Sequence, residues 1–169
     1  DKDEQKRFEE VSKQFTAAQK EFDKAMQNPM FAKGLEWRME FPEILDEDGN
    51  FTGFDLIIGN PPYIFSSNNS FSDSQKSYFL KTYPLNKYQA NTFGLFVELG
   101  FRLLRQGGTL SYIIPNSLLT VNQYQQMREF LTQRCGNLFI LNSKDKVFDE
   151  ASIDVCIISA DKREANNII

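Results

Sequence analysis

Apolar residues in the first part of the chain recur at the spacing of an α-helix. They are separated mostly by steps of three and four: Phe8, Val11, Phe15, Ala18, Phe22, Ala25 and Met26. This spacing places them on one side of a helix over residues 1 to about 27, which Asn28-Pro29 ends because a residue before proline is disfavoured in the helical conformation. We interpret the aromatic stripe as a packing face rather than a ligand site.

A second pattern, over residues 54–63, is a short apolar run followed by stiff polar residues. It runs Phe54-Asp55-Leu56-Ile57-Ile58-Gly59-Asn60-Pro61-Pro62-Tyr63. A run of this length, closed by turn residues, predicts a strand covered on both faces, as in a parallel sheet. Ligands of open α/β sheets bind beyond the carboxyl ends of such strands. The polar corner at residues 60–63 is therefore the first candidate site.

The segments on either side of this strand have weaker patterns. Alternating apolar and charged residues predict an extended segment at residues 35–45. The Asp-Glu-Asp-Gly-Asn cluster at residues 46–50 predicts a turn. Its three acidic residues could hold a divalent cation, but they lack the spacing and the closing Glu of a calcium loop, which favours a solvated turn. Residues 66–74 are mostly Ser and Asn, which favours a loop. This loop is either a lid beside the corner or a connection without a functional role. A short helix is expected at residues 75–83.

The second half of the chain alternates between predicted helices and strands. Helices are expected at residues 93–105 and 123–134, and strands at residues 109–114, 138–142 and 153–160. Asn91 or Thr92 is the expected N-cap of the first of these helices, and Gly107-Gly108 its end. The order β-α-β-α-β-β, with a short last connection, predicts an α/β fold whose sheet is mainly parallel with one antiparallel strand.

Composition narrows the function classes. The 169 residues are 41% hydrophobic and 25% charged, as in one ordinary globular domain. The formal net charge of −4 argues against a free-standing nucleic-acid binder, since phosphate contacts require clustered Lys and Arg. If the substrate is DNA, most of the basic surface lies elsewhere. No apolar run is long enough to span a membrane.

Few reactive side chains are available. The chain has no His, which removes Ser-His, Cys-His and His-metal chemistry. Cys135 and Cys156 fit no metal-ligand spacing, so we expect no metal site and interpret both as reduced core thiols of a cytoplasmic protein. The chain begins at Asp1 inside a charged helical segment, without an initiator Met, which predicts a piece of a longer protein.

The corner at residues 60–63 has the groups needed to hold an amine on an aromatic ring. The side-chain carbonyl of Asn60 and the backbone carbonyl of Pro61 can each accept one N–H, and neither proline nitrogen competes as a donor. Held in this way, the amine nitrogen moves towards a tetrahedral shape and exposes its lone pair. The ring of Tyr63 can stack on the base. The alternative is a rigid strand-to-loop turn with a packed Tyr.

Residues 54–63 resemble the catalytic motif of amino-group methyltransferases that use S-adenosylmethionine. The signature of that motif is Asn or Asp, then Pro, Pro, and Tyr, Phe or Trp. Over roughly residues 35–162, the chain resembles adenine-specific DNA methyltransferases of type II restriction-modification systems. The resemblance implies transfer of a methyl group from S-adenosylmethionine to the exocyclic amine of a flipped adenine.

The resemblance also implies roles for individual residues. Asn60, Pro61 and Tyr63 would be catalytic, and Asn60 would also touch the edge of the cofactor pocket. Pro62 and Phe148 would bind the substrate base, Phe148 from the side opposite to Tyr63. For Phe148, a purely structural role in the core is the alternative.

The main cofactor motifs of the family do not occur in this sequence. The family binds S-adenosylmethionine through a Gly-rich turn after its first strand and an acidic residue after its second, and neither precedes residue 54. We therefore predict a partial Rossmann-like methyltransferase fold, the C-terminal half of the sheet, preceded by an N-terminal helix. Residues 1–34 would be a helical lead-in or insertion, and residues 35–169 the catalytic half. The chain alone is expected to be inactive.

Two other functions are compatible with these features. Enzymes that methylate a glutamine side chain of release factors, or guanine in ribosomal RNA, have the same corner, and the chain could also be an inactive binding module. The resemblance favours a DNA enzyme. Its partner would be double-stranded DNA, bound in the cytoplasm through a recognition domain outside this chain and without membrane association.

Overall fold

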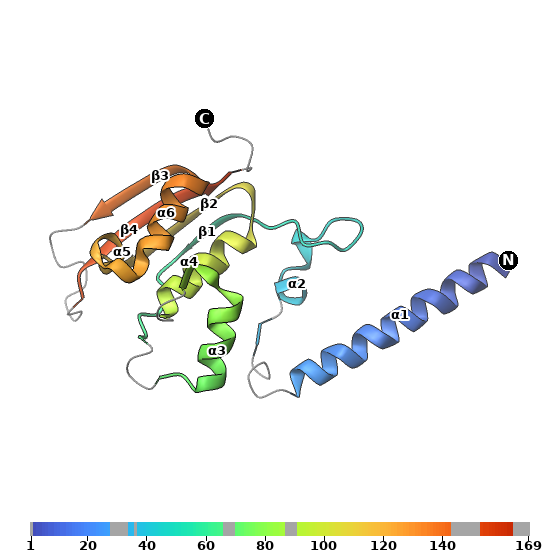
Figure 1. Cartoon of the computed structure of the whole chain (residues 1–169). Coiled ribbons are helices and arrows are strands. Elements are labelled where there is room, and N and C mark those ends of the chain that lie inside the picture. Colours follow the sequence, from blue (N-terminus) through green and yellow to red (C-terminus); the bar gives the residue numbers. More distant parts are fainter. Residues whose placement is uncertain are drawn as a thin grey trace. The chain divides into compact units, whose positions relative to one another are not determined.

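A computed structural model of the chain (Figure 1) describes residues 2–27, 34–35, 37–65, 70–86, 91–142 and 153–163. The chain divides into two units, Asp1–Glu43 and Ile44–Ile169, and each is described by itself. The division expected between residues 34 and 35 stays a prediction. No helix among the described residues is both long and apolar enough to cross a lipid bilayer.

The first unit contains the long helix α1 (Lys2–Met26), as its apolar spacing predicts. Asp3 and Glu4 in the first turn and Lys24 in the last turn complement the helix dipole. The described side chains of α1 are exposed, apart from Phe22, which is half-buried. The role of the aromatic stripe as a packing face stays a prediction.

The extended segment expected at residues 35–45 is wrong. Residues Trp37–Glu40 form a short helix, α2, and Pro42–Ile44 form a 3₁₀ turn. The rings of Trp37 and Phe41 stack with centroids 6.0 Å apart, and the Phe41 N–H donates to the Trp37 carbonyl oxygen at 2.9 Å. Contacts between residues four apart stabilise a helical turn. A short alternation of apolar and charged residues occurs in short helices as well as in strands, so the sequence pattern alone could not tell the two apart.

The predicted turn at residues 46–50 is confirmed. The backbone N–H groups of Asn50 and Asp48 donate to the Asp46 carboxylate at 2.8 and 3.0 Å. These bonds, those from Asn50 above all, hold the pKa of the Asp46 carboxyl below its usual value. Leu45 and Phe51 form an antiparallel bridge across the turn, which leads the chain into the first strand.

A four-stranded sheet in the order β1-β2-β4-β3 forms the centre of the second unit. Its strands are β1 (Phe54–Gly59), β2 (Leu104–Pro115), β3 (Cys135–Asn142) and β4 (Val155–Lys162). β1 and β2 are parallel, and β4 is antiparallel to both β2 and β3. The predicted α/β class, with one antiparallel strand, is confirmed. The order of elements along the chain did not specify that the last strand inserts between β2 and β3.

Helices connect the strands. Those at residues 73–82, 92–103 and 125–134 lie near the expected places, and the short helix at residues 117–120 was not predicted. They are α3 (Asp73–Thr82), α4 (Thr92–Leu103), α5 (Ser117–Thr120) and α6 (Gln125–Arg134). Ser72 and Gln75 form a capping box that starts α3. Asn91 caps α4 as predicted, because the Gly94 N–H donates to its side-chain oxygen at 2.8 Å.

The glycine cap expected at Gly107-Gly108 is wrong. Helix α4 ends at Leu103, and Leu104 already pairs with Phe54 of β1. Gly107, at φ 76°, lies within β2, where the pairing with β1 is irregular. The glycines therefore bend a strand rather than end a helix.

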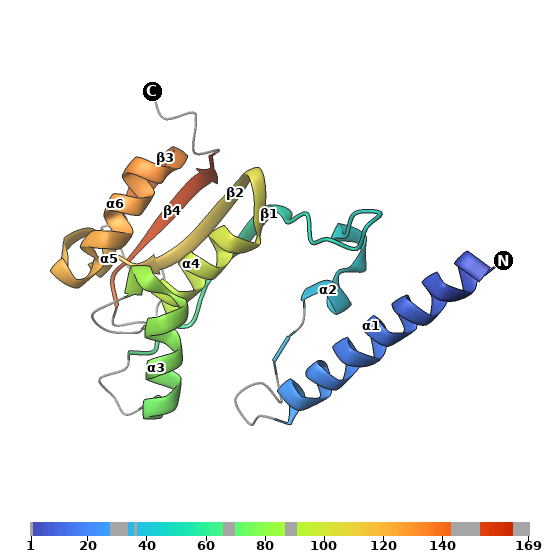
Figure 2. The same cartoon turned by 45° about the vertical axis from the view of Figure 1, so that its right-hand side comes forward.

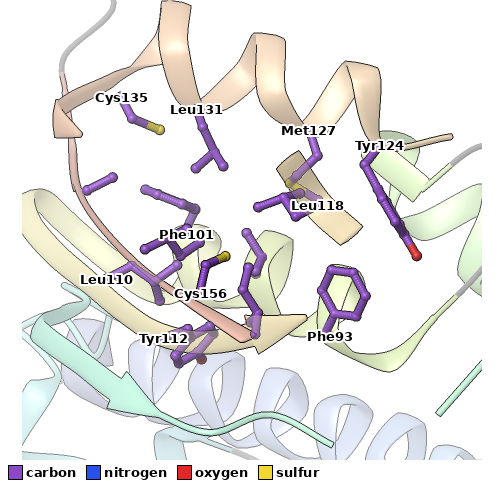
Figure 3. Packing of buried hydrophobic residues seen from close by; sticks show 14 of the residues in the cluster. Phe93, Phe101, Leu110, Tyr112, Leu118, Tyr124, Met127, Leu131, Cys135 and Cys156 are labelled. Carbon is purple, nitrogen blue, oxygen red and sulfur yellow. The ribbon is translucent and has the colours of Figure 1, made fainter. Parts of the chain in front are cut away.

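The core lies between one face of the sheet and the helices α4, α5 and α6 (Figures 1 and 2). Figure 3 shows side chains of α4 and α6 converging on those of β2 and β4. The buried residues include Phe93, Val97 and Phe101 of α4, Leu110 and Ile114 of β2, Met127 and Leu131 of α6, and Ile158 of β4. Interdigitation of these side chains holds α4 against the sheet.

Both cysteines are free and buried in this core, as predicted. Burial raises the pKa of the Cys135 thiol to about 12 and that of Cys156 to about 11, because a thiolate would lose its hydration there. Both thiols stay protonated at neutral pH and are poor nucleophiles.

Within the described residues, β1 is not covered on both faces, contrary to the expectation. β1 lies at an edge of the sheet. Its residue Ile57 packs against the core, whereas Leu56 and Ile58 are 57% and 74% exposed. Side chains alternate between the two faces of a strand, and the helices of the second unit cover only one of them.

The uncovered face extends across the sheet. The register places Ile58, Ser111, Ser159 and Phe139 in one row from β1 to β3. Phe139 is 58% exposed, and Leu141, on the same face of β3, is 51% exposed. We call Leu56, Ile58, Phe139 and Leu141 the exposed sheet face.

Gly53 lies directly before β1, where the backbones of β1 and β2 come close together. Replacing it with alanine tests this close approach. Its φ is +94°, and a Cβ there would lie 2.7 Å from the Leu104 carbonyl carbon and 2.8 Å from the Arg105 Cα. Gly53→Ala should lower the free energy of unfolding by about 1–2 kcal/mol from backbone strain and by a further 1–3 kcal/mol, roughly, from this overlap. Gly49→Ala is the control, because φ is +77° there and no atom lies within 4 Å. Equal losses for both variants in urea unfolding would contradict the close approach.

Candidate functional site

The polar corner lies where the sequence pattern places it. β1 ends at Gly59, which pairs with Tyr112 of the parallel strand β2, and residues 60–63 follow at the carboxyl end of both strands. Asn60 is exposed, Pro61 is buried and Pro62 is exposed. The buried proline fixes the backbone of the corner while the amide beside it stays accessible.

Tyr63 joins the corner to β2. Its hydroxyl lies 2.7 Å from the Asn60 side-chain oxygen and 2.9 Å from the Ile113 carbonyl oxygen, so the single phenolic proton is shared between two acceptors. Burial of the half-buried ring raises the pKa of Tyr63, with a smaller contribution from Cys156. The phenol therefore keeps its proton at neutral pH and remains a donor that holds the Asn60 amide.

Thr92 holds the chain after the corner. Its hydroxyl accepts a hydrogen bond from the Ile64 N–H at 2.8 Å and lies within hydrogen-bonding distance of the Pro62 carbonyl oxygen. The Thr92 N–H donates to the Ile64 carbonyl oxygen at 3.0 Å. One buried side chain at the start of α4 thus pairs with the backbone on both sides of Tyr63.

The start of α4 is itself fixed by its neighbours. Asn91, the N-cap, forms a bridge with Phe65 and donates from its amide nitrogen to the Tyr124 hydroxyl at 3.2 Å. The ring of Phe93 packs against those of Phe65 and Tyr124, with centroids 6.5 and 5.2 Å away. The supports of the corner therefore rest on the buried core.

The structure brings together most of the predicted site residues. Asn60, Pro61, Pro62 and Tyr63 form one contiguous corner. Phe148 lies outside the described residues, so its place opposite Tyr63 stays a prediction. The sequence patterns did not identify the supporting roles of Ile113 and Thr92. Thr92 was recognised as a possible helix cap, but nothing in its spacing indicated contact with Pro62.

A cavity in the second unit lies away from the corner. Its volume is about 500 Å³, and its lining includes Phe101, Arg102, Phe130, Arg134 and Lys162, near the amino end of β2 and the carboxyl end of β4. None of residues 60–63 lines it. We assign the candidate site to the corner, since its polar groups converge at the carboxyl end of parallel strands. Within the described ranges, no group of three or more His, Cys, Asp or Glu side chains could hold a metal ion.

Comparison with known families gives one match over most of the chain. A family model described as Eco57I restriction-modification methylase matches residues 1–148. The chain is 33% identical over 132 residues to a putative type II restriction enzyme and methyltransferase of Methanocaldococcus jannaschii, and 36% identical over 85 residues to a type II methyltransferase of Thermus thermophilus. These matches cover 78% and 47% of this chain but only 10% and 20% of the two relatives.

Solved structures show the same fold. A putative class I S-adenosylmethionine-dependent methyltransferase of Listeria monocytogenes matches with a TM-score of 0.52 and 18% identity, over 68% of this chain and 33% of that one. The type ISP restriction-modification enzyme LlaGI, solved with a DNA substrate mimic, matches with a TM-score of 0.54 and 16% identity, over 76% and 16% of the two chains. The second unit therefore has part of a methyltransferase fold.

Because the Thr92 hydroxyl pairs with the backbone on both sides of Tyr63, removing this hydroxyl alone should lower the stability of the protein markedly. Thr92→Val keeps the shape of the side chain but leaves the Ile64 N–H without its partner, so the free energy of unfolding should fall by about 1–3 kcal/mol. The Ile64 amide should also exchange with solvent faster in hydrogen-exchange measurements. Thr92→Ser keeps the hydroxyl and is the control. If Thr92→Ser loses as much stability as Thr92→Val, packing of the methyl group rather than the hydrogen bond holds the corner.

Proposed function

The chain belongs to the Eco57I restriction-modification methylase family, and from this premise we propose that it forms the catalytic half of a site-specific DNA methyltransferase acting on adenine. The observation that supports this most is the Asn60-Pro61-Pro62-Tyr63 corner, held rigid at the carboxyl end of β1 by Tyr63 and Thr92. The chain spans a tenth to a fifth of the length of its first two relatives, so the activity is proposed for the complete protein.

The corner would act by binding both hydrogens of an exocyclic amine. An amide oxygen has two lone pairs, so the Asn60 oxygen that faces the Tyr63 hydroxyl keeps one acceptor site for a substrate N–H. The Pro61 carbonyl would accept the second N–H. This geometry draws the nitrogen lone pair out of conjugation with the ring, and both carbonyl dipoles stabilise the positive charge that grows on the nitrogen during the reaction.

S-adenosylmethionine, when bound, would supply the methyl group on a sulfonium. The substrate amine would accept this methyl group and release one proton to solvent, and the cofactor would leave as a neutral thioether. The residues of this chain would hold the nitrogen in line with the methyl carbon, which lowers the barrier by orientation. Of the predicted site residues, only Asn60, exposed at the edge strand, would reach the cofactor pocket.

The adenine would have to leave the DNA duplex to reach this corner. Such flipping costs a few kcal/mol, roughly, which stacking on protein aromatics offsets. The ring of Tyr63 is half-buried and anchored through its hydroxyl, so it can present a fixed stacking surface. Pro62 and Phe148 would complete the contacts with the base.

The exposed sheet face supports the proposal that the cofactor half lies outside this chain. A parallel sheet is normally covered on both faces, and an edge strand normally has charged residues or a cover. β1 has one charged residue, Asp55, but it also presents Leu56 and Ile58, and both are more than half exposed. We propose that upstream parts of the protein pair with β1 and provide the S-adenosylmethionine site.

Membership of a restriction-modification family favours DNA over the protein-glutamine and ribosomal RNA substrates that the same corner could serve. The net charge of −4 supports a DNA-binding surface that would lie mostly in a recognition domain outside the chain. A cytoplasmic location is consistent with a DNA substrate and with two free thiols.

Replacing Asn60 tests the catalytic assignment. In the complete protein, Asn60→Ala should reduce methyl transfer to duplex DNA by about a hundredfold or more, because one of two acceptors for the amine is lost. Transfer of tritiated methyl groups to adenine measures the rate, and cofactor binding should be largely unchanged. Gln133→Ala, an exposed amide at the end of α6, is the control. Near wild-type transfer by Asn60→Ala would rule out this role.

If the cofactor half of the active site lies outside this chain, the isolated chain should not bind S-adenosylmethionine. Titration calorimetry with S-adenosylmethionine should detect negligible binding to the 169-residue chain, because it lacks the Gly-rich turn and acidic residue of the family. The complete protein, which would include the upstream half, should bind. Micromolar affinity of the isolated chain would show that the cofactor site lies within it.

A further inference from the structure

The apolar stripe of α1 follows a heptad repeat. Steps of three and four alternate strictly from residue 8 to residue 22, which places Phe8, Phe15 and Phe22 at one seam position and Val11 and Ala18 at the other. In the structure Phe8, Val11 and Phe15 are 74%, 58% and 70% exposed. This alternation, over about two heptads, matches the narrow seam of a coiled coil.

We propose that this seam binds the same helix of a second copy of the chain, in antiparallel orientation. The proposal is independent of the methyltransferase assignment. It rests on the size of the side chains, their exposure and the charges that flank them.

The size pattern favours the antiparallel arrangement. In a parallel pair, each seam position faces its own copy, which would stack phenylalanines on phenylalanines and leave a gap at Ala18. In an antiparallel pair, the two seam positions face each other. Phe15 of one copy then faces Ala18 of the other, and Val11 faces Phe22. Large and small side chains alternate across the seam in this register, as close packing requires.

The flanking residues allow the two helices to approach. In the same register, Ser12 of one copy lies beside Gln19 of the other, and Gln14 lies beside Glu21, so no like charges meet at the seam. Lys6, Lys13 and Lys20 share the outer position of the heptad and point away from it. The seam therefore combines steric complementarity with the absence of electrostatic repulsion.

Pairing would also stabilise the helix itself. Isolated helices are marginal in water, and most helical stability in proteins comes from burial of an apolar face. α1 has 25 residues, and its described seam residues are exposed or half-buried. Pairing with a second copy would bury these aromatic residues.

Sedimentation velocity of the 169-residue chain over a range of concentrations tests the proposal. The wild-type chain should form a dimer that dissociates on dilution, and Phe15→Glu should remain monomeric at every concentration. Thr16→Glu adds the same charge one residue away on the outer side of α1 and should dimerise like wild type. Urea unfolding of the second unit should be unchanged in both variants, since neither residue lies in its core. A monomeric wild-type chain, or a dimer that survives Phe15→Glu, would overturn the proposal.

A spin label at Lys6→Cys tests the orientation. The native thiols of Cys135 and Cys156 are buried, with pKa values of about 12 and 11, so an exposed cysteine on α1 is labelled selectively. In the antiparallel register, residue 6 of one copy lies level with residue 27 of the other, which separates the two labels along the axis by about 30 Å. A short distance between side-by-side labels would indicate a parallel pair and contradict the proposed register.

Discussion

The parallel pairing of β1 with β2 is the constraint on which the candidate site depends. It brings the carboxyl ends of two strands to one edge, so that residues after Gly59 meet the last residues of β2. Two successive prolines then remove two backbone donors from the corner, and side chains must provide the hydrogen bonds that a regular strand would make. Tyr63 does so by reaching the Ile113 carbonyl oxygen, and Thr92 by pairing with Ile64. The amide of Asn60 is left exposed but held in place.

The rigidity of the corner comes from the core beneath it. Thr92 opens α4, and the next residues of that helix include Phe93 and Val97, both fully buried. Because the core holds α4 against the sheet, the Thr92 hydroxyl has a fixed position, and so do the carbonyl groups near it. A site on a loop is thereby positioned by a helix and two strands. Supports of this kind keep acceptor groups within the small tolerances that an in-line transfer reaction requires.

Two apolar surfaces of the chain are left uncovered, and they differ in kind. The exposed sheet face lies on the two outer strands of the sheet, β1 and β3, which suits another layer of the same fold. The seam of α1 is a narrow stripe with heptad spacing, which suits another helix. The relatives are five to ten times longer than their matched parts, so there is room for the missing layer outside this chain. The two surfaces would therefore suit different partners.

The sequence by itself determined the parts that depend on local periodicity and turn chemistry. These are the helix at α1, the strand before the corner, the Asn91 cap and the corner itself with its proposed chemistry. Its local patterns failed at Trp37–Glu40, where contacts between residues four apart prevailed over alternation, and at Gly107, where pairing with β1 ended the helix early. Only the tertiary structure decided that β4 inserts between β2 and β3, that one face of β1 is open, and that Thr92 and Ile113 support the corner. The physical reason is distance along the chain. The contacts of Thr92 with Ile64 and of Ile113 with Tyr63 join residues 28 and 50 positions apart, and no local pattern specifies which distant groups will meet.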